Sequence, residues 1–243
     1  TGVHSGDSTA VLPPYSIEEK MLAEIRDKSI KLALSLNVRG LLNIQFAIKE
    51  NELYILEANP RASRTMPFVA KVTKNQIIKA GTLIMLGHKI KDILKDTDYL
   101  SSKTNKIAVK KAIFPWSRFP AEDTMLGPEM KATGEVLGIG SKLGIALNKA
   151  YAAAGVEIGV KQQGIFITLS DEDKNKFLKT IRKYKDLEFK IYATEGTSDF
   201  LSNNNIESIK VGRADDEAPT SLTIMEKDLI SVVINTPTFA NEY

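Results

Sequence analysis

The stretch LLNIQFAIKENELYILEANPR, residues 41–61, decides the fold of the first part of the chain. Apolar and polar residues alternate over 41–48, and a second run of strand-forming residues, 53–59, follows a polar turn at 50–52. This pattern is typical of an antiparallel β-hairpin with one buried face. The second strand then runs directly into charged residues, which a purely structural hairpin does not require.

The register of this hairpin can be predicted from its two faces. With a three-residue loop at 50–52, the pairs on one face are uniformly apolar, namely Ile48/Tyr54, Phe46/Leu56 and Ile44/Ala58. The other face carries Ala47/Ile55, Gln45/Glu57 and Asn43/Asn59. A two-residue loop would pair Ile44 with Glu57, which sets a charge opposite an apolar residue. The preferred register therefore predicts Gln45, Glu57 and Asn59 on one polar face.

The polar face has the chemistry of a divalent-cation site. A carboxylate and two amide oxygens suit Mg²⁺, which usually takes one or two carboxylates and completes its shell with substrate phosphates. Arg61 and Arg64 follow and can hold anionic oxygens. The alternative is an ordinary strand-end turn, because Asn-Pro is a common turn dipeptide. The position of Gln45 opposite Glu57 favours the cation site over the ordinary turn.

Composition limits the class of protein. With 43% hydrophobic and 26% charged residues, the chain resembles a soluble globular protein, and no apolar run or N-terminal pattern indicates a membrane span or signal peptide. The absence of cysteine excludes disulfides and thiolate zinc sites and fits a cytoplasmic location. A net charge of +3 with dispersed lysines gives little support for nucleic-acid binding. Two histidines, His4 and His88, are too few for a histidine-rich metal site.

Helical signals surround the hairpin. Ser16 and Glu19 form a capping-box signal for a helix whose apolar residues recur up to Leu36, and Asn37 and Gly40 end it. Further helices are predicted at 75–86 and at about 141–154, on either side of an irregular connection punctuated by prolines.

Strands and helices alternate from residue 164 onward. The predicted elements are strand 164–168, helix 171–184, strand 187–193, a short helix from 198, strand 206–211 and strand 229–235. This alternation indicates a doubly wound parallel sheet, whose ligands bind at the carboxyl ends of the strands. The stretch ATEGTSDF, 193–200, adds a helix N-terminus, which favours anions. The candidate anion-binding residues at this edge are Thr168, Lys174, Thr194, Thr197, Lys210 and Asn235. The alternative is that Thr194 and Thr197 are ordinary helix caps.

Several motifs together resemble one family. Gln45, LEANPRASRTMPF (56–68) and GVHSGDS (2–8) are similar to the ATP-grasp fold and, more narrowly, to the second synthetase half of the carbamoyl-phosphate synthase large-chain family. The continuation Arg-Thr-Met-Pro-Phe at 64–68 is typical of that half. FPWSRFP and LGPEMKATGEVLGIG, at 114–120 and 126–140, resemble its connecting segment.

The resemblance implies an α/β chain in three parts. Residues 1–86 would be the C-terminal part of an ATP-grasp domain with an antiparallel sheet, and 87–156 a helical connecting segment. Residues 157–243 would be a truncated, regulatory, methylglyoxal-synthase-like (MGS-like) domain with a doubly wound parallel sheet. Because the chain starts within a motif and stops just after a strand, we expect a piece of a longer protein that is inactive by itself.

The family's function would be the phosphorylation of carbamate to carbamoyl phosphate with ATP and Mg²⁺ or Mn²⁺, for arginine and pyrimidine biosynthesis. By resemblance, the metal ligands are Gln45, Glu57 and Asn59, the nucleotide-binding residues are Gly2, Val3, His4, Ser5, Gln45 and Glu57, and the residues near carbamate and the phosphoryl group are Arg61 and Arg64. Such a transfer needs charge neutralisation and alignment rather than a nucleophilic side chain.

The resemblance also implies a small glutaminase subunit as partner, an oligomeric full-length enzyme, and UMP or IMP as an effector at the anion-binding residues. Methylglyoxal synthase chemistry is not expected, because its histidine has no counterpart after residue 157. Asp7 matches an ornithine-contacting position of some relatives, but Lys111 replaces a glutamate there. A cation facing ornithine is repulsive, so ornithine activation is not expected. The ammonia source stays open.

Two other functions stay open at this point. One is a free-standing nucleotide-sensing module with a degenerate ATP-grasp remnant, which the length of the native reading frame would distinguish. The other is a different ATP-grasp ligase, such as a carboxylase or peptide ligase, which would not be followed by 114–140 and this C-terminal domain.

Overall fold

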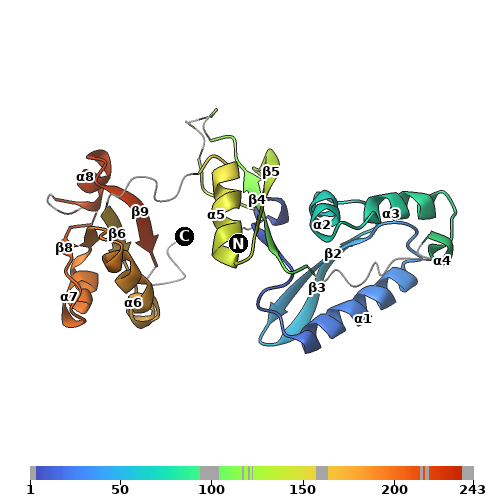
Figure 1. The fold of residues 1–243 in the computed structure, drawn as a ribbon, viewed down its shortest axis with the longest axis horizontal. Coiled ribbons are helices and arrows are strands. Elements are labelled where there is room, and N and C mark those ends of the chain that lie inside the picture. The colour runs from blue at the N-terminus through green and yellow to red at the C-terminus, as the bar shows by residue number, and fades with distance from the viewer. Residues whose placement is uncertain are drawn as a thin grey trace. The chain divides into compact units, whose positions relative to one another are not determined.

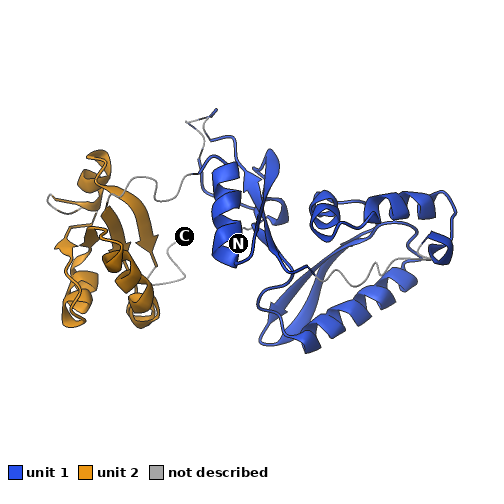
Figure 2. Ribbon diagram, viewed as in Figure 1, with its two compact units in different colours: residues 1–156 blue, residues 157–243 orange. Residues whose placement is uncertain are grey.

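The computed structural model describes residues 4–93, 104–116, 118, 119, 121, 123–156, 164–213, 216 and 219–236. The chain forms two compact units, unit 1 (Thr1–Val156) and unit 2 (Glu157–Tyr243), shown in Figure 2. Unit 1 thus contains both the expected ATP-grasp part and the expected connecting segment. Among the helices of the described ranges, none has the combination of length and apolar character that crossing a bilayer requires.

Unit 1 contains two antiparallel sheets with helices around them (Figure 1). Its elements are η1 (Ser5–Asp7), β1 (Ala10–Leu12), α1 (Glu19–Ser35), β2 (Asn43–Lys49), β3 (Glu52–Asn59), α2 (Thr65–Thr73), α3 (Ile77–Met85), α4 (Ile90–Ile93), β4 (Ile107–Ile113), β5 (Gly134–Gly140) and α5 (Leu143–Ala153). The hairpin β2–β3 forms one sheet, and β1, β4 and β5 form the other in the order β1-β4-β5.

Helix α1 covers the apolar face of the hairpin. Ile30 and Ala33 of the helix line a groove with Ile44 and Phe46 of β2. The helix ends as predicted, because Asn37 adopts a left-handed conformation (φ 48°) and Val38 N donates to Ala33 O at 3.0 Å. The predicted capping box is wrong: the N-cap is Glu18, without a side-chain hydrogen bond, so Ser16 lies outside the helix start.

The predicted pairing of the hairpin is confirmed around Gln45 and Glu57, and it is wrong near the turn. Asn43, Ile44 and Gln45 pair with Asn59, Ala58 and Glu57 as predicted, but a bulge between Gln45 and Phe46 then shifts the register by one residue. The turn has only two residues, Glu50 and Asn51, both with positive φ, which matches the twist of the strands. Leu53 and Ile55 therefore share the face of Phe46 in place of Tyr54 and Leu56.

The segment expected to be a helical connection also contributes strands. Strand β4 lies between β1 and β5 and pairs antiparallel with both. Ala10 of β1 lies opposite Lys110 of β4, and β5 pairs along the whole of β4. Helix α5 packs on this sheet through the buried cluster of Val109, Ala146 and Ala150. Alternating residues in 134–140 carry a strand signal that the glycines of this stretch weaken.

Unit 2 is a parallel sheet in the order β8-β7-β6-β9, which confirms the doubly wound class (Figure 1). Its elements are β6 (Gly164–Thr168), α6 (Asp171–Asp186), β7 (Ile191–Ala193), α7 (Glu195–Asn203), β8 (Ile209–Lys210), α8 (Ser221–Glu226) and β9 (Ile230–Asn235). Helix α7 begins at 195 rather than 198, and α8 had not been predicted.

The central strand β6 is buried on both faces. Ile165 and Ile167 belong to the core cluster that also contains Ile181 of α6 and Leu201 of α7. Phe166 points to the opposite cluster, with Ile224 of α8. Burial on both faces explains why GIFIT is continuously apolar instead of alternating.

The packing of α5 on β5 gives a test of unit 1. A Cβ atom at Gly138 would collide with the carbonyl oxygen of Ala146 and lie 2.5 Å from Ala150 N, whereas one at Gly134 would meet nothing within 4 Å. We expect Gly138→Ala to lower the stability of unit 1 by about 2 kcal/mol or more through overpacking, and Gly134→Ala to act as the matched control with a much smaller effect. Urea unfolding monitored by fluorescence of Trp116, the single tryptophan of the chain, measures both variants. Equal stability of the two would contradict the close packing.

Candidate functional site

The polar face of the hairpin carries the first candidate site. Gln45 lies directly opposite Glu57, and Asn59 opposite Asn43, so the structure brings Gln45, Glu57 and Asn59 to one face. The bulge lies immediately beyond this group and leaves its register intact. Glu57 is exposed, while Gln45 and Asn59 are partly buried, which leaves the carboxylate accessible and its neighbours more restricted.

The donor set of this face fits a hard cation with an incomplete protein shell. Within the described ranges, no group of three or more His, Cys, Asp or Glu side chains converges on a common point. A cation at Glu57 would therefore take one carboxylate and the amide oxygens of Gln45 and Asn59. Its remaining ligands would come from water or phosphate oxygens, as is usual for Mg²⁺.

The two arginines lie on the turn that leaves β3. Arg61 N donates to Asn59 O at 2.8 Å, which closes the turn, and Arg61 Nη1 donates to Ala62 O at 2.9 Å. Arg64 occupies the N-cap position of α2, and both arginine side chains are exposed. Between them, Ser63 Oγ is buried without a hydrogen-bond partner among the described residues. A buried hydroxyl without a partner is costly, so this turn favours a polar ligand or water.

The expected nucleotide residues at the N-terminus are only partly described. Gly2 and Val3 lie outside the described residues. His4 caps η1, because its Nδ1 accepts a hydrogen bond from Gly6 N at 3.0 Å, and Ser5 is exposed. The hydrogen bonds recorded for His4 stay within residues 4–8, so the structure orients this segment locally and does not join it to Gln45 or Glu57.

Asp7 ties this N-terminal segment to the connecting segment. Its side chain is buried, with the residue only 3% exposed, and its two carboxylate oxygens accept hydrogen bonds from Lys131 N at 3.0 Å and Ala132 N at 2.8 Å. Charge-assisted bonds of this kind offset the desolvation of a buried carboxylate. The family resemblance matches Asp7 to an ornithine contact, and both of its carboxylate oxygens are thus already engaged by main-chain N–H groups.

Lys111 is held by α5. Its Nζ lies 4.3 Å from the ring centroid of Tyr151, a cation–π contact, and burial lowers the pKa of its ammonium group. The neighbouring Lys110 points to the other face of the sheet, where its Nζ pairs with Glu135 at 3.1 Å.

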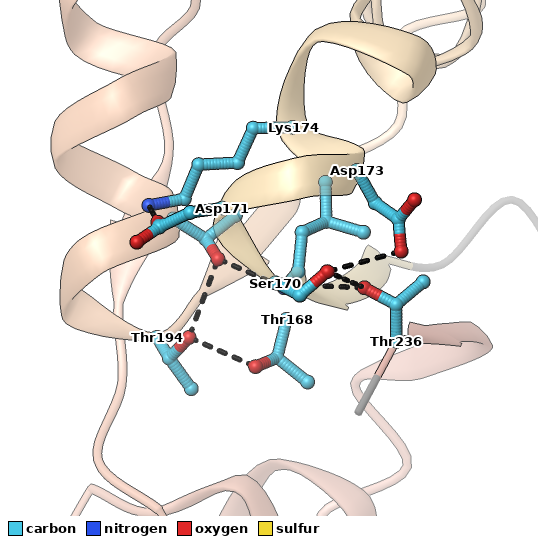
Figure 3. Close-up of polar contacts among 9 residues, drawn as sticks. Thr168, Ser170, Asp171, Asp173, Lys174, Thr194 and Thr236 are labelled. Carbon is cyan, nitrogen blue, oxygen red and sulfur yellow. Dashed lines mark hydrogen bonds and ion pairs between the residues drawn. The ribbon is translucent and has the colours of Figure 1, made fainter. Parts of the chain in front are cut away.

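The second candidate site is the anion crevice, defined here as Thr168, Lys174, Thr194 and the N-terminus of α7 in unit 2. Thr194 Oγ1 donates to Thr168 Oγ1 at 3.1 Å across the ends of β7 and β6 (Figure 3). Lys174 Nζ lies near the α7 N-terminus, since a Cβ atom at Gly196 would be 3.7 Å from it, and it forms an ion pair with Asp171 at 2.5 Å. An ammonium group and a helix N-terminus together favour an anion.

Three other predicted members of this site have different surroundings. Thr197 is almost fully buried, and its Oγ1 accepts a hydrogen bond from Leu169 N at 3.0 Å. Lys210 Nζ is paired with Asp199 at 3.1 Å and Glu195 at 3.2 Å, and both carboxylates raise the pKa of its ammonium group. Asn235 lies in register with Thr168 at the sheet edge and is exposed. The structure therefore brings Thr168, Lys174 and Thr194 together and turns Lys210 towards α7.

Sequence reasoning missed the residues that support this crevice. Ser170 N donates to Thr236 Oγ1 at 2.8 Å, and Ser170 Oγ donates to Asp173 Oδ2 at 3.0 Å (Figure 3). The hydrogen bond from Lys176, followed by that from Ser170, lowers the pKa of the Asp173 carboxyl. The stretch Ser-Asp-Glu-Asp at 170–173 is itself a helix-start signal, but nothing local marks Thr236, which is distant in the sequence.

Comparisons with known proteins find one family match in each unit. Residues 1–93 match the family model described as carbamoyl-phosphate synthase L chain, ATP binding domain, and residues 176–242 match the MGS-like domain. The chain is 39% identical to the carbamoyl phosphate synthase large chain, C-terminal section, of Aquifex aeolicus, over 99% of this chain and 47% of the relative. It is 45% identical to the carbamoyl phosphate synthase large chain of Archaeoglobus fulgidus, over 97% of this chain and 22% of the relative. The chain thus spans less than half the length of these curated relatives.

The buried carboxylate of Asp7 gives a test of how the N-terminal segment is held. We expect Asp7→Ala to lower the stability of unit 1 by about 2 kcal/mol, because the buried N–H group of Ala132 and the partly buried N–H group of Lys131 lose their acceptor. Asp123→Ala is the matched control, since Asp123 Oδ1 also accepts a main-chain hydrogen bond, from Met125 N at 2.9 Å, but at an exposed position. Urea unfolding followed by Trp116 fluorescence compares the free energies of unfolding of the two variants. Equally small losses of stability would show that Asp7 does not anchor the N-terminal segment.

Proposed function

We propose that this chain serves the ATP-dependent phosphorylation of carbamate to carbamoyl phosphate, because residues 1–93 match the model of the carbamoyl-phosphate synthase L chain, ATP binding domain, and residues 176–242 match the MGS-like domain. The observation that carries this proposal is the cross-strand pair of Gln45 and Glu57 on the polar face of β2–β3. That pair, with Asn59 beside it and two arginines on the following turn, forms a cation- and anion-binding group at one strand end.

Phosphoryl transfer explains the residue types of this group. Gln45, Glu57 and Asn59 would hold Mg²⁺ or Mn²⁺, which neutralises charge on the phosphates of ATP when bound. Arg61 and Arg64 would hold carbamate and the transferring phosphoryl group through planar, bidentate contacts. The buried hydroxyl of Ser63 offers a further polar contact beside them. Alignment and neutralisation are sufficient for this chemistry, so it requires no nucleophilic side chain.

The nucleotide would also contact the N-terminal segment. His4 and Ser5, with Gly2 and Val3 before them, would line the nucleotide together with Gln45 and Glu57. The cap of His4 on η1 and the anchoring of Asp7 support a fixed shape for this segment. Because the relatives are longer than this chain, we expect carbamoyl phosphate synthesis to need a protein of their length. In that protein the ammonia would come from a small glutaminase subunit, and the product would serve arginine and pyrimidine biosynthesis.

Unit 2 would regulate this activity by binding the phosphate of a nucleoside monophosphate such as UMP or IMP. The support is the anion crevice, where two threonine hydroxyls, one lysine and a helix N-terminus meet. Ornithine activation is not expected, because Lys111 is cationic and Asp7 is engaged by the main chain.

The two other functions considered from the sequence have less support. A carboxylase or peptide ligase would share the acidic metal site, but the relatives named above match this chain across both units. A free-standing nucleotide sensor with a degenerate ATP-grasp remnant would bind its nucleotide through unit 2, and such a remnant would not need to keep Gln45 opposite Glu57.

Replacement of the single carboxylate tests the synthetase site. In a protein of the length of the relatives that includes this chain, we expect Glu57→Gln to reduce carbamoyl phosphate synthesis from carbamate about 100-fold or more, because a charged cation ligand becomes neutral. Glu52→Gln is the matched control, since Glu52 lies on the same strand, is exposed and accepts a hydrogen bond from Tyr54 OH. A rate near that of the wild type at ordinary Mg²⁺ would mean that Glu57 is not a ligand.

Calorimetry with UMP and IMP tests the effector site. We expect Lys174→Ala and Thr194→Ala each to weaken binding by about 1–3 kcal/mol, the usual range for a charge-assisted hydrogen bond or a lost buried partner. Lys179→Ala is the control for general charge effects, because Lys179 is an exposed lysine of the same helix. If the double variant of Lys174 and Thr194 binds both nucleotides as tightly as the wild type, the anion crevice is not the effector site.

A further inference from the structure

The loop between β6 and α6 is held by threonines from two other parts of unit 2. Leu169 N donates to Thr197 Oγ1 of α7 at 3.0 Å, and Ser170 N donates to Thr236 Oγ1, just beyond β9, at 2.8 Å. Thr236 also binds the loop through its own main chain, since Thr236 N donates to Thr168 O at 3.0 Å. Thr236 therefore contacts this loop on both sides of Leu169.

We infer that Thr236 is a positioning residue for the anion crevice: by holding the 168–170 loop through its hydroxyl and its N–H group, it fixes Thr168 and Lys174 for an anion. This inference rests on the proposed anion site and extends it, because Thr236 is not itself one of the residues that define the anion crevice. It concerns a contact between residues 66 positions apart in the chain.

The hydrogen bonds of Thr236 form a directed chain. A hydroxyl has one proton and two acceptor lone pairs, so Thr236 Oγ1 can accept from Ser170 N and still donate to Ser170 Oγ, which is 3.4 Å away. Ser170 Oγ in turn donates to Asp173 Oδ2 at 3.0 Å, and the chain ends on that carboxylate (Figure 3). The side chain of Ser170 is thereby used as a donor and does not cap α6, although Ser170 is the N-cap residue. Thr236 is thus linked through Ser170 to the first turn of α6.

The same loop carries two of the anion-binding groups. Thr168, whose carbonyl oxygen accepts from Thr236 N, presents its hydroxyl to Thr194 Oγ1 at 3.1 Å. Lys174 lies one turn into α6, and its N–H donates to Ser170 O at 3.2 Å. A shift of residues 168–170 would therefore move Thr168 and Lys174 together, away from the α7 N-terminus that they face.

The arrangement leaves a ligand to be bound by side chains and by the α7 N-terminus, because the main-chain N–H groups of this loop are already engaged. The N–H groups of Leu169 and Ser170 are saturated by threonine hydroxyls, so the loop contributes rigidity instead of main-chain donors. An anion at this edge would meet Thr168 and Thr194, whose hydroxyls are hydrogen-bonded to each other, and Lys174, whose ammonium group would share its charge between the anion and Asp171. Thr168 pairs with Asn235 in the β6–β9 register. The next residue, Thr236, therefore lies at the 168–170 loop, so the end of β9 borders the anion crevice.

Residue-resolved amide hydrogen exchange on the 243-residue chain tests the contact itself. We expect Thr236→Val, which removes the hydroxyl at nearly constant volume, to speed exchange of the Ser170 N–H by about fivefold or more, while Leu169 N–H, held by Thr197, changes little. Thr236→Ser should restore the wild-type rate, and Thr180→Val, at an exposed site of α6, serves as the matched control. Should the valine variant not fold, Thr236→Ala is measured in its place.

Calorimetry with inorganic phosphate and with UMP, far below the melting temperature of each variant, tests the positioning role. We expect Thr236→Val to weaken binding about fivefold, which corresponds to about 1 kcal/mol, with rescue by Thr236→Ser and no effect of Thr180→Val. Unchanged affinity together with faster Ser170 exchange would overturn the inference and leave the anion site standing. Failure of the wild-type chain to bind either ligand would overturn the anion site, and with it the role of Thr236.

Discussion

The antiparallel register of β2 and β3 is the constraint on which the first candidate site depends. Because side chains alternate across a strand, a shift of one residue near Gln45 would move Glu57 to the face that packs on α1. Such a shift would bury a carboxylate among Ile44 and Phe46. The same apolar packing that stabilises the hairpin therefore holds the polar group together on the opposite face.

The sequence predicts this register only where the two faces differ in polarity. Between Ile44 and Glu57 the choice is clear, and the prediction holds. Towards the turn both faces contain apolar residues, so the pattern cannot reveal the bulge at Leu56. The turn is equally hidden, because its two positive φ angles belong to Glu50 and Asn51, and a glutamate gives no signal for that conformation. Strand β5 was missed for a related reason, because its glycines weaken the alternating pattern.

Unit 2 is easier to predict in its fold than in its site. Alternating apolar runs and helical segments are sufficient to indicate a parallel sheet, and the carboxyl edge then follows from strand direction. Which polar groups actually meet there depends on charges and hydroxyls far apart in the sequence. Lys210 at the end of β8 pairs with Glu195 and Asp199 of α7, and Glu195 belongs to this helix only because α7 begins at 195 rather than 198.

The N-terminal segment of unit 1 and the loop beside the anion crevice of unit 2 are held in the same way, by side-chain oxygens that accept main-chain N–H groups. Asp7 accepts the N–H groups of Lys131 and Ala132, and threonines accept those of Leu169 and Ser170, in each case across a long sequence separation. An irregular segment has main-chain donors that no helix or sheet satisfies, and burial without a partner would cost about 1–3 kcal/mol for each. A side-chain oxygen from a distant element removes that cost and fixes the segment at the same time. In unit 2 the crevice side chains then need not stabilise the loop, and their contacts are instead with one another, in the Thr194–Thr168 hydrogen bond and the Lys174–Asp171 ion pair.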